Sequence, residues 1–295
     1  MGRQENADKC FEAIMSIHGE DDYKAMAKRL RKFQQNSEKF AVSGVTLPNY
    51  LWIAKRGGGV STRVNALAEY LYEAQLVAFS GKFKFFEFRL GYDRPNEAFS
   101  ELTRLNNVIL EVAGRHRYFR GIACINIDEW LEHTDEPHFS TFLDFLAANN
   151  DKVMVVFNIH TTNKRIIESA ESVISSYLRL ETVRLKFPRT AVLLEIIEQK
   201  YIAQHGFSFT EDAKQLLSES IREISNGKHF HGFITIRQLA NDILYSILTS
   251  DLKGVMISAD MLSEFAKNSA YVKRIKAFVG VPNVIGFAAM EDRLI

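Results

Sequence analysis

At 295 residues the chain is longer than a typical domain of about 100 to 200 residues, which predicts one large domain and a smaller one. Apolar residues make up 46% of the chain, which excludes the disordered and fibrous classes. The 37 Lys and Arg residues are balanced by 36 Asp and Glu residues, so no global charge makes nucleic acid or an anionic membrane an obligatory partner.

The two cysteines, Cys10 and Cys124, favour a reducing compartment, because Cys124 lies in an apolar run and a disulfide framework is not indicated. The first residues are polar and do not resemble a signal peptide. No run approaches the roughly 18 apolar residues of a membrane span. We therefore expect a cytoplasmic protein that makes no membrane contact.

The N-terminal segment, residues 1–46, is predicted to be helical over residues 8–39. Met26, Leu30 and Phe33 recur at helical spacing on one side. Basic side chains occupy the other side, namely Lys24, Lys28, Arg31 and Lys32. This pattern fits either a basic binding helix or a solvated face above an apolar stripe.

Residues 47–188 alternate between short apolar runs and amphipathic segments. The apolar runs predict strands at residues 50–54, 82–90, 122–127, 153–159 and 182–187. Helical spacing between them predicts helices at residues 63–77, 96–113, 139–148 and 164–178. Strands that alternate with helices imply an α/β domain with a buried, parallel sheet.

Beyond Pro188 the predicted strands stop. Three amphipathic helices are expected at residues 190–203, 211–224 and 235–248, so residues 189–249 are assigned to a small helical domain. Residues 250–295 form a C-terminal extension with a further helix predicted at 259–279.

The clearest candidate for chemistry is the segment from Ala54 to Thr62, AKRGGGVST, between a predicted strand and a predicted helix. Its glycines allow backbone N–H groups to converge on an anion at a helix N-terminus. The register of a Walker A phosphate loop fits at Gly59 and Ser61 but fails at Ala54 and at Val60, where glycine and lysine are required. A glycine turn that serves only close packing is the alternative.

A second motif lies 66 residues after Thr62, where IACINIDE reads as an apolar strand that ends in Asp128 and Glu129. This resembles a Walker B element, in which Asp128 supports Mg²⁺ and Glu129 orients an attacking water. A strand that leaves the core into a charged turn is the alternative. Both carboxylates are candidate catalytic residues, and Ser61 and Asp128 are the candidate metal ligands.

With these motifs in this order, residues 47–248 resemble a degenerate AAA+ ATPase of the P-loop NTPase superfamily. The resemblance implies a five-stranded sheet domain followed by a helical lid, and ATP or ADP with Mg²⁺ as ligands. It implies a first sensor at Asn158, His160 or Thr161 and a second sensor at Arg237. The implied nucleotide-binding residues are Gly57, Gly58, Gly59, Val60, Ser61, Thr62, Asn158 and Arg237.

Two departures from the AAA+ pattern put hydrolysis in doubt. Val60 removes the lysine charge that meets the β- and γ-phosphates, and Tyr177 stands where AAA+ rings commonly present an arginine finger. Lys55 or Arg56 is a conceivable replacement cation.

The sequence therefore favours a nucleotide-binding or pseudo-ATPase scaffold or switch for a protein or nucleic-acid partner, as a monomer or dimer rather than a hexamer. The alternatives are an active ATPase, with nucleic acid as a candidate substrate, and an interaction protein that binds no nucleotide.

Two further patterns are weaker. His229 and His231 form an H-x-H pair that could bind zinc, but neither cysteines nor carboxylates accompany it, so a loop role is favoured. A basic patch precedes the third strand, at Arg115, His116, Arg117 and Arg120. It fits either a solvated turn or a surface facing a pore or nucleic acid.

Overall fold

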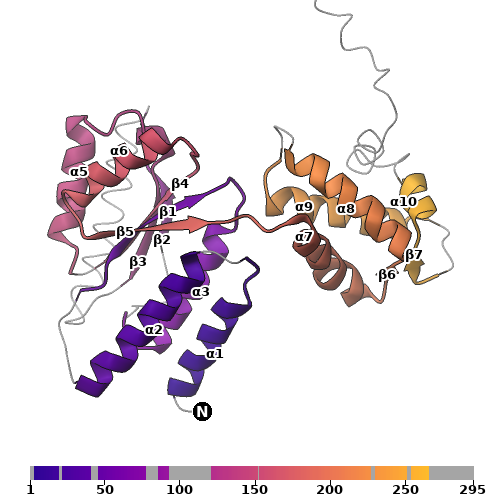
Figure 1. Ribbon diagram of the computed structural model, residues 1–295, viewed down its shortest axis with the longest axis horizontal. Helices are drawn as coiled ribbons and strands as arrows, with labels where there is room; N and C mark the ends of the chain where they lie inside the picture. The colour runs from indigo at the N-terminus through magenta and orange to yellow at the C-terminus, as the bar shows by residue number, and fades with distance from the viewer. Residues whose placement is uncertain are drawn as a thin grey trace, which may run out of the picture. The chain divides into compact units, whose positions relative to one another are not determined.

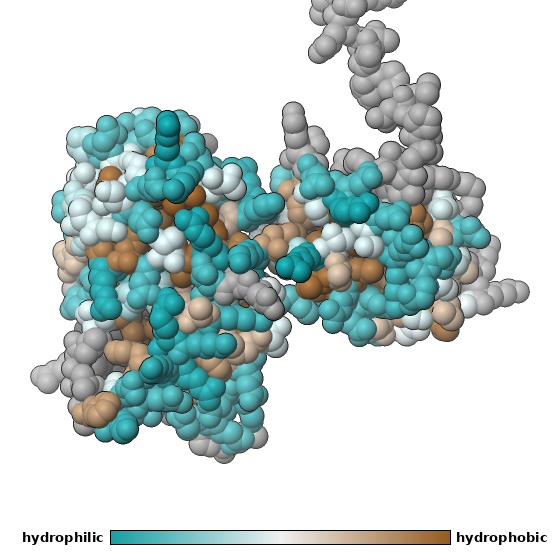
Figure 2. Space-filling view, viewed as in Figure 1, coloured by the Kyte–Doolittle hydropathy of each residue, from teal (hydrophilic) through white to brown (hydrophobic). Residues whose placement is uncertain are grey.

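The computed structural model describes residues 3–19, 22–40, 46–77, 86–92, 121–151, 153–226, 230–250 and 254–265. The chain divides into two compact units, Met1–Phe187 and Pro188–Ile295. The first contains a sheet with helices on both faces, and the second is mainly helical (Figure 1). Both present a mostly hydrophilic surface in the view of Figure 2, with scattered hydrophobic residues. None of the described helices is long and apolar enough to cross a membrane.

The sheet of the first unit has five strands in the order β2-β3-β4-β1-β5, and every neighbouring pair is parallel. The strands are β1 (Asn49–Ala54), β2 (Phe86–Arg89), β3 (Ile122–Asn126), β4 (Met154–Ile159) and β5 (Leu180–Leu185). The predicted parallel sheet is confirmed, and β1 lies between β5 and β4 as the AAA+ resemblance requires. Burial of all residues of β1 and β4 explains why these strands read as continuous apolar runs.

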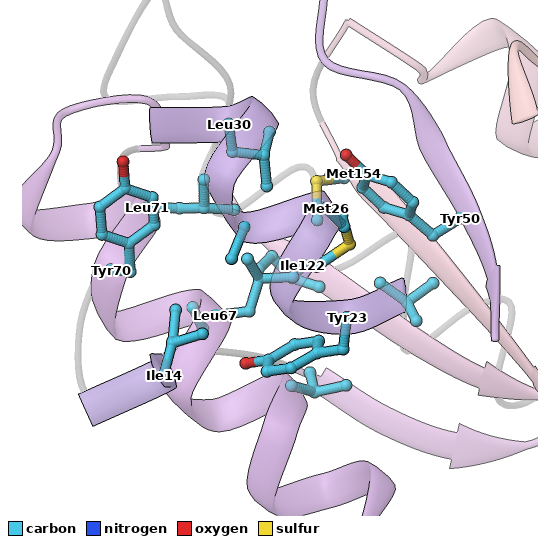
Figure 3. Packing of buried hydrophobic residues seen from close by; sticks show 14 of the residues in the cluster. Ile14, Tyr23, Met26, Leu30, Tyr50, Leu67, Tyr70, Leu71, Ile122 and Met154 are labelled. Carbon is cyan, nitrogen blue, oxygen red and sulfur yellow. The ribbon is translucent and has the colours of Figure 1, made fainter. Parts of the chain in front are cut away.

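Three helices cover one face of this sheet: α1 (Arg3–Ser16), α2 (Asp22–Phe40) and α3 (Val60–Glu73). Tyr50 and Met154 from the strands pack there against Met26 of α2 and Leu67 of α3, all almost fully buried (Figure 3). Burying one such side chain contributes about 1.5 to 3 kcal/mol. This shared core joins the N-terminal segment to the sheet.

The opposite face is covered by α5 (Pro137–Ala148) and α6 (Lys164–Ser175), as Figure 1 shows. The alternation of strand side chains divides the two cores, so that Leu51 and Phe157 point to this face while Trp52 and Val156 point to the other. Both layers are needed because β1 and β4 are buried along their whole length, on both faces.

Two predicted boundaries are corrected, and a third prediction lies partly outside the described residues. The helix expected over residues 8–39 is two helices, with residues 17–19 between them outside any helix and Gly19 at φ 121°, a backbone conformation that breaks a helix. The helix after the glycine turn begins at Val60 rather than Arg63. The second strand is described only over Phe86–Arg89, and the predicted helix at 96–113 lies outside the described residues.

Asn49 links the strands at their N-terminal end. Its side chain is fully buried, its Oδ1 accepts a hydrogen bond from the N–H of Val155 at 2.8 Å, and its Nδ2 donates to Oδ1 of Asn150 at 2.7 Å. Its backbone N–H donates to the carbonyl of Arg179 at 2.9 Å. One buried residue thus joins the start of β1 to two segments that are far from it in sequence, residues 150–155 and Arg179.

The second unit is built on α8 (Glu211–Asn226), α9 (Phe233–Leu248) and a first helix that begins as α7 (Thr190–Ile196). That helix continues as a π-helical segment (Ile197–Ile202) and a 3₁₀ turn (Ala203–His205). The short α10 (Ala259–Phe265) follows, and the rest of the helix predicted at 259–279 lies outside the described residues. Contrary to expectation, two strands also occur, β6 (Ser208–Phe209) and β7 (Met256–Ile257), paired in parallel. Each strand has only two residues, too few to show the alternation of apolar and polar residues that predicts a strand from sequence.

Candidate nucleotide-binding site

The candidate residues of the first unit gather at the carboxyl edge of its sheet. The register pairs Ile53 of β1 with Ile159 of β4, and Asn158 of β4 with Asn126 of β3, so the ends of three adjacent strands lie level. Ligands of parallel α/β sheets bind at this edge, because the loops that leave it carry the polar groups.

The glycine loop leaves β1 through a tight turn. The N–H of Gly58 donates to the carbonyl of Lys55 at 2.9 Å, and Gly57 has φ 70°. A Cβ on Gly58 would lie 2.7 Å from the oxygen of Lys55, closer than any side chain tolerates. Gly59 has φ 79° and ψ 31°, in the left-handed region. Each of the three glycines therefore occupies a position that an L side chain would strain.

Helix α3 begins directly after this loop with no side-chain cap at Gly59. The helical bonding starts when the N–H of Arg63 donates to the carbonyl of Gly59 at 3.1 Å. N–H groups of a first turn have no intrahelical acceptor, and they favour an anion together with the helix dipole. Ser61 and Thr62 are exposed there, so the turn is open to a ligand.

Arg63 supports the loop from inside the protein, a role that the sequence did not reveal. Its side chain is 2% exposed, and its Nη1 donates to the carbonyl of Gly58 at 2.6 Å. Its Nη2 donates to the carbonyl of His18 at 3.3 Å, in the connection between α1 and α2. The hydroxyl of Tyr23 on α2 donates to the carbonyl of Arg63 at 2.8 Å. The N-terminal helices thus help to set the shape of the loop.

Val60, at the position of the Walker A lysine, is only 7% exposed and belongs to the apolar cluster under α3. It brings no charge to the loop. Lys55 and Arg56, the suggested replacement cations, are exposed in the loop itself.

Asp128 follows β3, at the start of a 3₁₀ turn (Asp128–Trp130). It is held by His160, which directly follows β4, and by Asn126 at the end of β3. Its Oδ1 accepts the backbone N–H of His160 at 2.7 Å, and its Oδ2 lies 2.6 Å from Nδ1 of the same residue. Nδ2 of Asn126 also donates to Oδ2, at 3.1 Å. Burial alone raises the pKa of Asp128, but the hydrogen bonds from His160 and Asn126 outweigh burial, so the pKa is lowered and the carboxylate is ionised at neutral pH.

Glu129 is engaged at both oxygens. Oε1 lies 2.6 Å from Nη2 of Arg89 at the end of β2, and Oε2 accepts the backbone N–H of Tyr92 at 2.8 Å. Both oxygens are thus held by donors of the chain, which orient the carboxylate toward the end of β2, and each oxygen keeps a further lone pair.

Ser61, the candidate metal ligand in the loop, donates its hydroxyl to Oε1 of Glu87 on β2 at 2.8 Å. The described residues contain no group of three His, Cys, Asp or Glu side chains that could hold a metal ion. His231 of the H-x-H pair belongs to no such group. His229 and the basic patch at residues 115–120 lie outside the described residues.

The three candidates for the first sensor differ in environment. Asn158 is 6% exposed on β4, on the face that carries α3, and its Oδ1 has no hydrogen-bond partner in the described part of the chain. His160 is committed to Asp128. The hydroxyl of Thr161 accepts the N–H of Asn163 at 3.1 Å in a local turn. Asn158 is therefore the candidate whose buried oxygen has no partner among the described residues, and its sensor role stays a prediction.

Arg237, the second-sensor candidate, lies exposed on α9 in the second unit. Its contact with a nucleotide also stays a prediction.

Neither a protein-family model nor a curated protein sequence matches the chain. Several solved structures, in contrast, are similar to the chain. PCH-2 of C. elegans aligns with a TM-score of 0.55 at 12% identity over 92% of this chain and 72% of that one. The fold is that of AAA+ ATPases. RuvB of Thermotoga maritima aligns at 0.48 with 12% identity, over 81% of this chain and 67% of that one. Drosophila ORC, bound to DNA and Cdc6, aligns at 0.46 with 10% identity, over 95% of this chain and 47% of that one.

Sequence reasoning missed the partners that this edge supplies to Ser61, Asp128 and Glu129, which are Glu87, Asn126, Arg89 and Tyr92. One signal was available for the contact between Asp128 and His160. Each stands two residues beyond a paired position, Asn126 and Asn158, so a correct strand register brings them together.

Proposed function

We propose that the first unit is a nucleotide-binding or pseudo-ATPase module that serves as a scaffold or switch for a protein or nucleic-acid partner. The observation that carries the proposal is the glycine loop, with Gly57 and Gly59 at positive φ and the uncapped first turn of α3 behind them, at the carboxyl edge of an AAA+ sheet. Buried Asn158, with its unpaired oxygen on the neighbouring strand, gives this edge a second polar group available to a ligand.

Two features argue for binding with little hydrolysis. Val60 provides no charge for the γ-phosphate, and Glu129 is paired with Arg89 and the N–H of Tyr92. Phosphoryl transfer depends mainly on positioned charge, so a loop without lysine is expected to bind a nucleotide weakly and to turn it over negligibly.

Isothermal titration of the full chain with ATP and ADP tests binding, and Gly58→Ala and Gly121→Ala form a matched pair. Gly58→Ala places a Cβ against the carbonyl of Lys55, whereas a Cβ on Gly121 meets nothing within 4 Å. We expect binding to the wild type and to Gly121→Ala, and a loss of at least about tenfold in affinity for Gly58→Ala. Absence of binding to the wild type would leave the glycine loop as a packing turn and favour an interaction protein.

A turnover assay separates the pseudo-ATPase from the active ATPase. We expect no hydrolysis above background for the wild type. Steady hydrolysis that Glu129→Gln abolishes would support an active enzyme in which Lys55 or Arg56 replaces the lysine.

A further inference from the structure

The AAA+ fold implies magnesium beside the nucleotide, but the residues at this edge do not fit that ion. Mg²⁺ requires near-octahedral oxygen ligands, usually one or two protein oxygens together with waters and phosphate. A protein oxygen can serve only if its lone pairs are free or are released easily.

Asp128 has little capacity left. Its carboxylate offers about four lone-pair sites, and His160 N, His160 Nδ1 and Asn126 Nδ2 approach its two oxygens at 2.7, 2.6 and 3.1 Å. His160 holds both oxygens at once, and the Asp128 and His160 side chains are only 15% and 18% exposed. Releasing Oδ1 would require moving the backbone that follows β4, because its donor is the main-chain N–H of His160.

The contact also defines the chemistry of His160. An ionised carboxylate only accepts hydrogen bonds, so Nδ1 must carry the proton. Nδ2 of Asn126, which lies 3.3 Å from that nitrogen, then donates to Asp128 and to the carbonyl of Asn158 at 3.1 Å. The proton on Nδ1 takes the place that a cation would have against this carboxylate.

The other candidate ligand, Ser61, donates its only proton to Glu87, so its hydroxyl is oriented toward β2. Its oxygen keeps its lone pairs, but a neutral hydroxyl brings no charge for a cation, and the carboxylate beside it is the one that accepts its proton. Glu129 is paired with Arg89. Each acidic group that this edge could offer a metal thus has a partner within the chain.

We propose that His160 is the permanent partner of Asp128 in place of a magnesium ion, so that a nucleotide bound at the glycine loop is bound without a divalent cation. This inference rests on the proposed nucleotide-binding function.

Titration of the full chain with ADP and ATP, once with Mg²⁺ and once with EDTA, tests it on the wild-type protein. We expect the two dissociation constants to agree within about threefold. Binding that Mg²⁺ tightens by more than about tenfold overturns the inference and leaves the proposed function standing. Absence of binding in both buffers overturns both.

Titration with Mn²⁺ alone, followed by water proton relaxation, tests the role of His160 without any nucleotide. We expect no saturable binding to the wild type, and a gain for His160→Ala that Asp128→Asn in the same chain removes. His160→Asn, which keeps an N–H donor beside Asp128, and His138→Ala, on the exposed face of α5, should behave like the wild type. Wild-type binding that Asp128→Asn abolishes, or no gain in a folded His160→Ala protein, overturns the assignment.

Discussion

At the scale of single residues, Val60 separates this loop from a charged phosphate loop. We expect Val60→Lys to tighten ATP binding by about 1 to 3 kcal/mol, because an ammonium at the start of α3 can make a charge-assisted contact with phosphate. Val60 is also part of the apolar cluster, so the same change should destabilise the unliganded protein by roughly 1 to 3 kcal/mol. Isothermal titration and urea unfolding measure the two effects, and unchanged ATP affinity in a folded variant would contradict the first.

Tyr70 is a residue whose ionisation should limit stability in alkali. Burial raises the pKa of Tyr70 to about 12, against an ordinary value of about 10, and its hydroxyl donates to Oε1 of Gln34 at 3.1 Å. The folded state therefore favours the neutral phenol, whose contribution is complete below pH 10 and is lost as the pH rises toward 12. Tyr70→Phe should cost about 1 kcal/mol at neutral pH and flatten this alkaline decline.

Unfolding in urea at a series of pH values measures this difference. Trp52 and Trp130, the two tryptophans of the chain, both lie in the first unit, so their fluorescence reports that unit alone. Tyr72→Phe, on the exposed side of the same helix, is the control. Equal alkaline slopes for the wild type and Tyr70→Phe would show that Tyr70 does not carry the effect.

At the scale of elements, Asn49 joins the start of β1 to β4 and to the segments that precede β4 and β5. Asn49→Ala leaves the buried N–H of Val155 without its acceptor, and an unsatisfied buried donor costs about 1 to 3 kcal/mol. We expect Asn49→Ala to lower the free energy of unfolding of the first unit by this amount, measured by tryptophan fluorescence. Asn65→Ala, on the partly exposed surface of α3, should stay within about 0.5 kcal/mol of the wild type. Similar losses for both variants would refute the linking role of Asn49.

At the scale of the whole molecule, the structure bears on assembly through the end of α6. Tyr177, at the position of an arginine finger, packs against the apolar cluster of its own unit. The carbonyl oxygen of Arg179 accepts the backbone N–H of Asn49, and the side chain of Arg179 is exposed. We expect a monomer or dimer whose mass ATP does not change, measured by light scattering, and the same mass for Arg179→Ala. An ATP-induced hexamer that Arg179→Ala disrupts would identify Arg179 as a finger in shifted register.

The local pattern of apolar residues was sufficient to predict the class of fold. Apolar runs such as Val153 to Ile159 are continuous because the strands are covered on both faces, and this alone implies a parallel sheet with helices on each side. The glycine turn between β1 and α3, and the two carboxylates after β3, were visible because each motif lies within a few consecutive residues. The break at Gly19 was missed because a glycine is often tolerated inside a helical pattern.

The tertiary structure decided which partner each residue of the candidate site has. Asp128 meets His160 at a separation of 32 residues and Ser61 meets Glu87 at 26, through strand order and register that no local spacing encodes. Arg63 reads as one more polar residue of an amphipathic helix, yet it is buried beneath the glycine loop. The sequence by itself determined which groups stand at the carboxyl edge of the sheet, because each follows directly from its own strand. Only the folded chain determined which of them pair with one another, because pairing depends on distances between strands.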